Sequence, residues 1–153
     1  MLRGLFRAVS RLGDGVVWYA LMAAMPLFFG FSQWQQGLRV SAQMLCAGAF
    51  GLVLYKFLKH RLVRERPFIG LIGIECAMPP LDRYSFPSGH TLHAVLFTAI
   101  AIRHVPELAV LLVPFALLVA ASRVVLGLHY PTDVLAGATL GALVAAVSEA
   151  VFW

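Results

Sequence analysis

Five long stretches of apolar residues constrain the fold of this chain more than any other feature of its sequence. They cover residues 16–31, 40–58, 88–105, 107–126 and 132–153, and turn-forming or charged residues separate them. A transmembrane helix needs about 20 mostly apolar residues, or fewer where side chains at its ends anchor it in the interface. We therefore predict an all-α fold, a polytopic bundle of about five transmembrane helices that forms one membrane-embedded domain over residues 1–153.

The composition also favours a membrane location. The chain has 153 residues, of which 61% are hydrophobic and 12% charged, and its mean hydropathy of +0.85 lies well above that of soluble domains. The basic residues lie between the apolar stretches and form no continuous patch, so we expect the lipid bilayer and anionic lipid head groups as partners, and no nucleic acid. Cys46 and Cys76 have neither metal-ligand spacing nor a disulfide framework.

Residues 1–13 have the pattern of an amphipathic helix. The apolar face holds Leu2, Leu5, Phe6 and Val9, and the opposite face holds Arg3, Arg7 and Arg11. We predict a helix that lies in the interface of the bilayer. A basic start before an apolar stretch is also typical of a signal peptide, but no small-residue cleavage site follows 16–31, so we expect an uncleaved span.

Ionisable and small polar residues gather at one end of the predicted bundle. If five spans alternate in direction, the N-terminus, residues 56–87 and residues 127–133 face the same water layer. Charged groups are costly at membrane depth and normally mark function. The residues that share this side are Lys59, Arg66, Ser88, His90, Arg123, His129 and Asp133.

Lys59 and Arg66, the latter followed by Pro67, form the first of three polar motifs. A separation of seven residues is about two helical turns, so both cations share one face if the helix continues. Such a face suits a phosphate. The alternative is an ordinary juxtamembrane cluster of basic residues that meets lipid phosphates.

The second motif, Phe-Pro-Ser-Gly-His at residues 86–90, opens the third span. Ser88 is a good N-cap, Gly89 lets a ligand approach the backbone, and the free N–H groups of a helix start bind anions. The imidazole of His90 is suited to donate a proton to a leaving oxygen. The alternative is a capped helix start with an interfacial histidine, and His93, one turn on, suits a packing role better than catalysis.

The third motif runs from Ser122 to Asp133. Arg123 ends the fourth span, and Pro131 suits the first turn of the fifth, which leaves His129 in the connection. A carboxylate that accepts a hydrogen bond from one imidazole nitrogen leaves the other nitrogen free to attack, and Asp133 is spaced to orient His129 in this way. The alternative is an aspartate that caps a helix beside a surface histidine.

Together the motifs resemble the signatures of the type 2 phosphatidic acid phosphatase family, within the superfamily that also contains vanadium-dependent haloperoxidases and acid phosphatases. The signatures Lys-x6-Arg-Pro, Pro-Ser-Gly-His and Ser-Arg-x5-His-x3-Asp stand without a departure at 59–67, 87–90 and 122–133. The resemblance implies a membrane phosphatase that hydrolyses a lipid phosphate. Lys59, Arg66 and Arg123 would bind the phosphoryl oxygens, and Ser88 and Gly89 would add hydrogen bonds.

The resemblance also implies the catalytic roles. His129 would attack phosphorus and form a phosphohistidine, His90 would protonate the leaving group, and Asp133 would orient His129. This chemistry needs His129 neutral and His90 protonated at the start. The sequence has no acidic cluster typical of a metal site, so we expect no metal ion and no cofactor.

A phosphate site at the helix ends would receive a head group while the lipid chains stay in the bilayer. The expected substrate is a lipid of the polyprenyl pyrophosphate, phosphatidylglycerol phosphate or phosphatidic acid type. The loop 68–86, which contains Glu75, Asp82 and Arg83, is expected to line the entrance. Arg83 is a candidate for head-group selectivity, with a plain loop salt bridge as the alternative.

The charge distribution bears on which side of the membrane the site faces. Ten of the 12 Lys and Arg residues fall on the predicted site side, and only Arg39 and Arg103 fall opposite, which by the positive-inside rule favours the cytoplasm. Phosphate-binding cations inflate that count, and many bacterial members of the family that the motifs resemble act on the outer face. We therefore predict a bacterial inner (cytoplasmic) membrane protein with a periplasmic site, and keep the cytoplasmic face as the alternative.

Other classes of function make different predictions. A non-catalytic membrane protein that binds anionic lipid head groups through the same basic ends would bind lipid without turnover. A haloperoxidase would need bound vanadate and usually a soluble scaffold, and a transporter would need polar groups near mid-membrane. The sequence favours the phosphatase, with the lipid-binding protein as the alternative.

Overall fold

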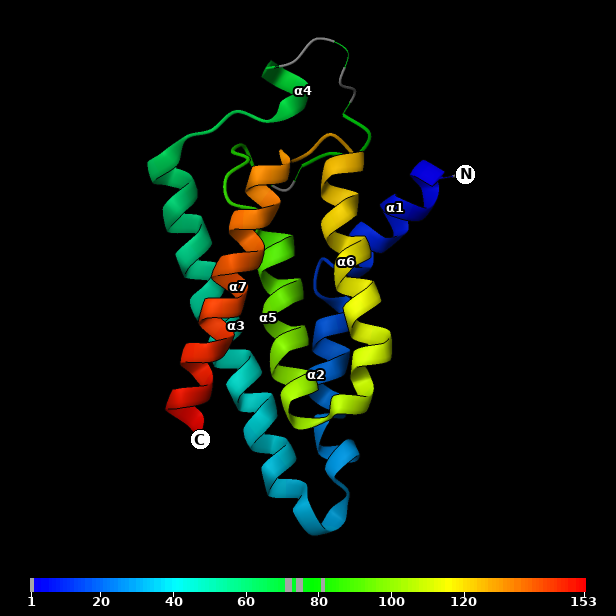
Figure 1. The fold of residues 1–153 in the computed structure, drawn as a ribbon, viewed down its shortest axis with the longest axis vertical. Coiled ribbons are helices and arrows are strands. Elements are labelled where there is room, and N and C mark those ends of the chain that lie inside the picture. The colour runs from blue at the N-terminus through cyan, green and yellow to red at the C-terminus, as the bar shows by residue number, and fades with distance from the viewer. Residues whose placement is uncertain (1, 71–72, 74–75, 81) are drawn as a thin grey trace.

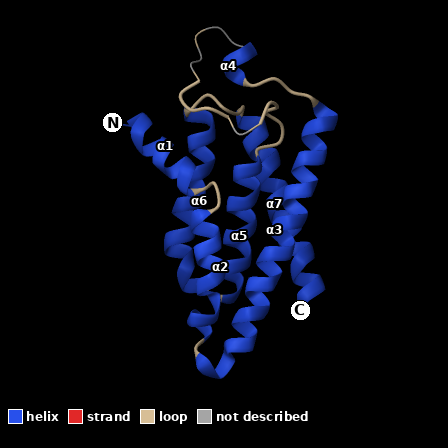
Figure 2. Ribbon diagram, turned by 180° about the vertical axis from the view of Figure 1, so that it is seen from behind, coloured by secondary structure: helices blue, strands red, loops and turns tan. Residues whose placement is uncertain are grey.

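The computed structural model describes residues 2–70, 73, 76–80 and 82–153, and every regular element within them is a helix (Figure 2). The elements are α1 (Leu2–Leu12), α2 (Val16–Phe29), the 3-10 turn η1 (Phe31–Gln33), α3 (Trp34–Leu62), α4 (Pro67–Gly70), α5 (Gly89–His104), the 3-10 turn η2 (Pro106–Leu108), α6 (Ala109–Val125) and α7 (Pro131–Phe152). The predicted all-α class is confirmed.

The helices α2, α3, α5, α6 and α7 run side by side and alternate in direction (Figure 1). α5 lies at the centre of this bundle, with α7, α6 and α3 packed against it. The alternation brings the α1–α2 turn, the end of α3 and the starts of α5 and α7 to the same end, beneath α4. This is the end at which the sequence placed the polar motifs.

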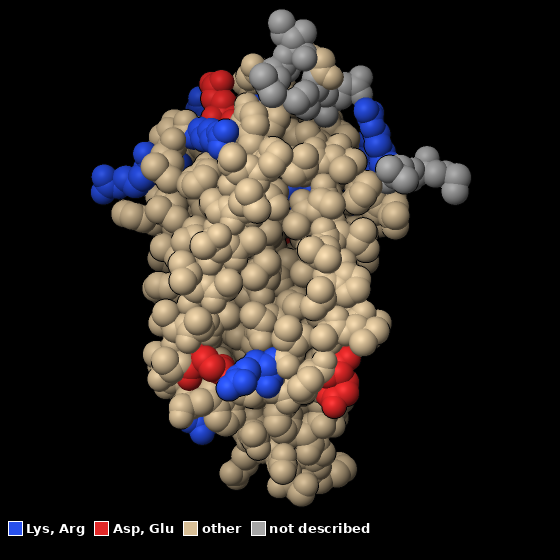
Figure 3. Space-filling view, in the orientation of Figure 1, with Lys and Arg blue, Asp and Glu red and all other residues tan. Residues whose placement is uncertain are grey.

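Three segments are long and apolar enough to cross a membrane, namely Phe31–Gly70, Pro106–Val125 and Pro131–Phe152. Arg3–Leu12 and Val16–Phe29, bent by 48°, add a fourth if the pair is one broken span. α5 has only 16 residues, which is short for a span, so the count of five stays a prediction. On the face drawn in Figure 3, charged side chains gather towards the two ends with a broad uncharged band between them.

The connection that the sequence predicted at 32–39 is mostly helical, because α3 already begins at Trp34. Gly37 accounts for the early start. A Cβ at Gly37 would lie 2.5 Å from the Cα of Pro26 in α2, so the two backbones touch there. The first turns of α3 therefore pack on α2 and do not form a loop.

Gly137 and Gly141 set the distance between α5 and α7. A Cβ at Gly137 would lie 2.4 Å from the carbonyl oxygen of Ser88, and one at Gly141 would lie 2.4 Å from that of Leu92. This pair of glycines lets the helices approach closely. The contact holds the first turns of α5 and α7, which carry residues of two polar motifs, next to each other.

We expect Gly141→Ala to destabilise the protein by about 1–3 kcal/mol, because the new methyl group meets the backbone of α5, which cannot give way. Gly4→Ala in α1 is the matched control, since a Cβ there has nothing within 4 Å and alanine favours a helix. Thermal unfolding in detergent measures both. Equal melting temperatures for the two variants would contradict the close approach.

Candidate active site

The three polar motifs meet at one cavity of about 30 Å³ at the end of the bundle near α4. Its lining residues are Tyr55, Lys59, Arg66, Asp82, Gly89, His90, Arg123 and His129. Only Tyr55 and Asp82 lie outside the motifs. Segments far apart in the sequence therefore form a single site.

Three cations reach this cavity from helix ends. Lys59 lies in the last turn of α3, Arg66 directly precedes α4, and Arg123 lies in the last turn of α6. Their exposed fractions are only 5%, 1% and 2%. Burying like charges together is unfavourable unless an anion or several acceptors compensate them, so the cavity is built to hold negative charge.

Asp82 supplies negative charge to two of these cations. Its Oδ1 lies 2.7 Å from Nζ of Lys59 and 2.7 Å from a terminal nitrogen of Arg66. Burial raises the pKa of Asp82, but the hydrogen bond and charge of Lys59, and then the charge of Arg66, outweigh burial and lower this pKa below its usual value. The ionised carboxylate thus pairs with Lys59 and Arg66, the two cations of the first motif, which are predicted to bind phosphate.

Arg123 keeps a donor free for a ligand. One terminal nitrogen of its guanidinium donates to Oγ of Ser10 in α1. Its Nε is buried and has no hydrogen-bond partner among the residues that the structure describes. Because a buried N–H without a partner is costly, this N–H is suited to a ligand oxygen in the cavity.

His129 lies in the turn between α6 and α7, with its Nδ1 3.6 Å from Oδ2 of Asp133. This distance is within ion-pair range but longer than a hydrogen bond. The carboxylate of Asp133 is held by the backbone N–H of Tyr130, 2.8 Å from Oδ2, and by Arg64, 2.8 Å from Oδ1. Asp133 therefore faces Nδ1 from a fixed position, which leaves Nε2 as the nitrogen available to a substrate.

The environment of His129 keeps its ring neutral. Burial lowers its pKa to about 4, and Asp133 opposes this shift, while the positive charges of Arg123, Arg66 and Lys59 add to it. A neutral imidazole has a lone pair with which to attack phosphorus. The expectation from the sequence that His129 starts neutral agrees with this environment.

His90, in the first turn of α5, meets an aspartate that the sequence did not single out. Its Nε2 is in contact with Oδ1 of Asp14, in the turn between α1 and α2. Asp14 stands between two glycines at the site end of the bundle, but no motif links it to a histidine 76 positions away. Only the fold brings the two side chains together.

Comparison with known sequences identifies the family. The family model described as PAP2 superfamily matches residues 40–153 of this chain, a region that includes all three motifs. This chain belongs to the PAP2 superfamily. The resemblance inferred from the motifs is thereby confirmed.

Several known proteins match most of this chain. An undecaprenyl-diphosphatase from Sulfolobus acidocaldarius is 28% identical over 148 residues, which cover 96% of this chain and 69% of that protein. A decaprenylphosphoryl-5-phosphoribose phosphatase from Mycolicibacterium smegmatis is 36% identical over 135 residues, which cover 86% and 68%. The crystal structure of a transmembrane PAP2-type phosphatidylglycerolphosphate phosphatase from Bacillus subtilis superposes with a TM-score of 0.74 at 27% identity, covering 98% of this chain and 76% of that one.

The apolar helices and the membrane relatives together show that this PAP2 chain is an integral membrane protein. The relatives are lipid phosphatases, which supports a hydrolase acting on phosphate esters. Among residues 2–70, 73, 76–80 and 82–153, no three His, Cys, Asp or Glu side chains cluster as metal ligands.

Some residues that the sequence analysis singled out do not line the cavity. Ser88 is buried and caps α5, accepting a hydrogen bond from the backbone N–H of Thr91 at 3.4 Å, whereas its neighbour Gly89 lines the cavity. Arg83 is exposed, with its guanidinium over the ring of Tyr84, so its role in selectivity stays a prediction. Glu75 lies outside the described residues.

The lowered pKa of His129 predicts a pH-dependent stability. The unfolded chain binds a proton at the ordinary pKa of 6.5 and the folded chain only near 4, so lowering the pH from 7 to 4 favours unfolding. We expect wild type to lose about 3 kcal/mol relative to His129→Gln over this range. Melting temperatures in detergent measure the difference. His60→Gln, at an exposed position, is the control, and the same pH response in both variants would contradict a buried neutral His129.

Asp82→Asn is expected to bind inorganic phosphate about tenfold more tightly, because the carboxylate no longer competes for Lys59 and Arg66. Isothermal titration calorimetry measures the affinity. Glu65→Gln removes the same charge from an exposed position next to Arg66 and controls for long-range charge. Weaker phosphate binding by Asp82→Asn than by this control would show that Asp82 supports the anion site and does not compete with the anion.

Proposed function

We propose that this protein hydrolyses a phosphate monoester or pyrophosphate of a membrane lipid through a phosphohistidine on His129, without a metal ion. The observation that carries the proposal is the convergence of Lys59, Arg66, Arg123, His90 and His129 on one buried cavity. Three cations and two imidazoles from separate segments of the chain are the parts that phosphoryl transfer needs. The PAP2 membership supports the same chemistry.

Phosphate binding is the first step of the proposed reaction. The phosphoryl group displaces the carboxylate of Asp82 from Lys59 and Arg66, and the free Nε of Arg123 donates to a third oxygen. The backbone N–H of Gly89 lies at the start of α5. N–H groups at a helix start have no partner within the helix and attract anions. Ser88 stabilises the first turn of α5 as its N-cap. Its motif also implies a hydrogen bond from Ser88 to the phosphate.

Transfer to His129 is the second step. Nε2 of His129 attacks phosphorus and the bond to the leaving oxygen breaks, while Asp133, 3.6 Å from Nδ1, stabilises the positive charge that develops on the ring. His90 gives its proton to the leaving oxygen. Asp14 holds Nε2 of His90 and releases it when the substrate arrives.

Hydrolysis of the phosphohistidine completes the cycle. A water molecule attacks phosphorus from the side that the lipid has left, and His90 accepts its proton. The bond to His129 breaks and inorganic phosphate leaves. The charge on the five-coordinate phosphorus is neutralised by Lys59, Arg66 and Arg123, which take the part that a metal ion plays in other phosphatases.

The proposed substrate is a lipid of the polyprenyl pyrophosphate, phosphatidylglycerol phosphate or phosphatidic acid type. Two relatives are named as phosphatases of undecaprenyl diphosphate and of decaprenylphosphoryl-5-phosphoribose, and the relative of known structure as a phosphatase of phosphatidylglycerol phosphate. The site lies at the polar end of an apolar bundle, where a head group can enter while its chains remain in lipid. Arg83, exposed on the loop above the site, is the proposed contact to the rest of the head group.

We further propose a membrane topology. α2, α3, α5, α6 and α7 form five spans in a bacterial inner membrane, with α5 borrowing the turn at Ser88 to reach sufficient length, and α1 lies in the interface. The site faces the periplasm. The alternation of the five helices supports the five spans, because it brings the end of α3 and the starts of α5 and α7 to one end of the bundle.

A non-catalytic lipid-binding protein is the alternative function, because exposed basic residues near Lys59, such as Arg61, also suit anionic head groups. It would bind lipid through any of these cations. The buried Arg66 and Arg123 favour the enzyme, because a head group that binds only at the surface needs no buried cations.

Purified protein in detergent with EDTA is expected to release phosphate from one or more of these lipids. His129→Ala removes the nucleophile and is expected to lower kcat at least a thousandfold while the protein stays folded. Phosphate release measures kcat, and circular dichroism measures whether the variant stays folded.

Lys59→Ala and Arg61→Ala form a matched pair for the phosphate site. They remove a cation two positions apart on α3, but only Lys59 lines the cavity, whereas Arg61 is exposed beside Phe57. We expect a loss of at least a hundredfold in kcat/KM for Lys59→Ala and less than threefold for Arg61→Ala. Similar losses for both would support the lipid-binding alternative.

A further inference from the structure

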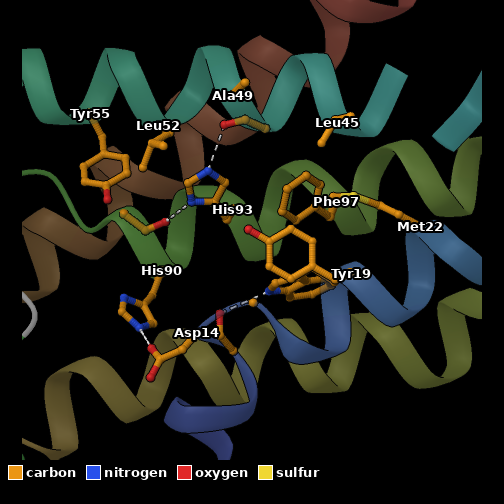
Figure 4. A pocket seen from close by; sticks show the side chains of 15 residues that line it. Asp14, Tyr19, Met22, Leu45, Ala49, Leu52, Tyr55, His90, His93 and Phe97 are labelled. Atoms are coloured by element: carbon orange, nitrogen blue, oxygen red, sulfur yellow. Dashed lines mark hydrogen bonds and ion pairs between the residues drawn. The ribbon is translucent and has the colours of Figure 1, made fainter. Parts of the chain in front are cut away.

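The partner of His90 comes from a part of the chain that the family match does not cover. Asp14 lies before residues 40–153, which the family model matches, and outside the three motifs. Figure 4 shows the carboxylate of Asp14 and the ring of His90 pointing towards each other, with Oδ1 in contact with Nε2. A carboxylate to which no motif gives a role therefore touches the proposed general acid.

The turn between α1 and α2 holds Asp14 in a fixed place. On one side, Gly13 packs against α6, because a Cβ there would lie 3.1 Å from a methyl group of Val119. The indole N–H of Trp18 donates to the carbonyl oxygen of Gly13 at 3.2 Å. On the other side, Gly15 has a φ of 137°, a conformation that favours glycine. The backbone on both sides of Asp14 is thus fixed, and this aims the carboxylate at α5.

The same segment also supports Arg123. Its Ser10, one helical turn before Asp14, accepts a hydrogen bond from a terminal nitrogen of Arg123, and this serine is completely buried. The contact forms because α1 packs against α6, whose last turn carries Arg123. Residues 10–14 therefore hold one phosphate-binding cation and the proposed general acid from the same side of the site.

The surroundings of His90 oppose a positive charge on its ring. The side chain is only 12% exposed, and it lines the same cavity as three cations. Burial and nearby cations both disfavour an imidazolium. The titratable groups that share this cavity with His90 are Tyr55, Lys59, Arg66, Asp82, Arg123 and His129. A general acid at this position therefore needs a carboxylate of its own.

Asp14 supplies that carboxylate from outside the phosphate cavity. It lines a neighbouring cavity of about 300 Å³, and His90 lines both cavities. The carboxylate of Asp82, by contrast, pairs with two of the phosphate-binding cations. Asp14 is thus placed to stabilise a positive charge on His90 without competing with the phosphate for those cations.

We propose that Asp14 is the positioning residue of the general acid, which keeps the ring of His90 protonated and oriented until the substrate binds. This inference rests on the proposed function, in which His90 protonates the leaving oxygen. When the bond between phosphorus and that oxygen breaks, the proton on Nε2 passes to the oxygen and the ring becomes neutral. The water that hydrolyses the phosphohistidine returns a proton to the ring, and the ion pair with Asp14 forms again. Asp14 stays ionised throughout.

The leaving group distinguishes a role in proton supply from a role in folding. An alkyl phosphate needs a proton on its leaving oxygen, whereas a nitrophenyl phosphate releases a stable phenolate without one. We expect Asp14→Asn to lower kcat/KM about tenfold or more for the alkyl phosphate and less than about threefold for the nitrophenyl phosphate. Glu65→Gln removes the same charge from an exposed position next to Arg66 and is expected to change neither. Equal losses for both substrates in Asp14→Asn would overturn the proposal.

The pH profile of kcat/KM gives a second readout that a structural role would not move. Without the carboxylate, His90 holds its proton less tightly, so the protonated form is lost at a lower pH. We expect the alkaline limb for the alkyl phosphate to move down by about one pH unit or more in Asp14→Asn, with activity recovering as the pH falls. An alkaline limb at the same pH as in the wild type would overturn the proposal.

A measurement without turnover separates this inference from the proposed function. In a His129→Ala protein, NMR of carbon-13-labelled histidine rings follows the protonation of His90, whose signal is assigned by adding His90→Gln. We expect the midpoint of this titration to fall by about one pH unit or more when Asp14→Asn is added. Such a fall, with no phosphatase activity in the wild type, would refute the proposed function and leave the pairing of Asp14 with His90 supported. An unchanged midpoint would overturn the pairing whatever the activity.

Discussion

Three buried cations at one end of an apolar bundle are the constraint on which the rest of the structure depends. Lys59, Arg66 and Arg123 are held together out of water, an arrangement that is stable only with compensating negative charge. In the structure, Asp82 supplies that charge to two of them. A phosphoryl group offers more charge and more acceptor atoms than one carboxylate, so the same cations that need Asp82 are ready for a phosphate.

The packing of the helices brings the residues of the site together. The glycines of α7 let α5 approach until backbone touches backbone, and the N–H of Ser88 then donates to the carbonyl oxygen of Asp133 at 3.0 Å. This seats the helix start that carries His90 against the turn that carries His129. Small residues of α7 thus determine how closely the residues of the site are held together at the helix ends.

The sequence predicted the all-α class, the order of the helices and six of the eight residues that line the cavity, because long apolar stretches mark the helices and the three motifs lie at their ends. It did not predict the contact of Asp14 with His90 or the pairing of Asp82 with Lys59, since both join loops to helices distant in the sequence. The sequence analysis also failed to predict the helical start of α3, because Gly37 and the Gln residues there favour a turn. Only the structure shows that the backbone of Gly37 packs against Pro26 of α2. Each of these features depends on tertiary contacts between segments that are distant in the sequence.

A structure of the protein with bound vanadate is the most direct test of the central claim, because vanadate adopts the five-coordinate geometry of phosphoryl transfer. We expect vanadium bonded to Nε2 of His129, its oxygens in contact with Lys59, Arg66 and Arg123, and the carboxylate of Asp82 displaced. Vanadate bound elsewhere, or an unchanged pairing of Asp82 with both cations beside an empty cavity, would contradict the account.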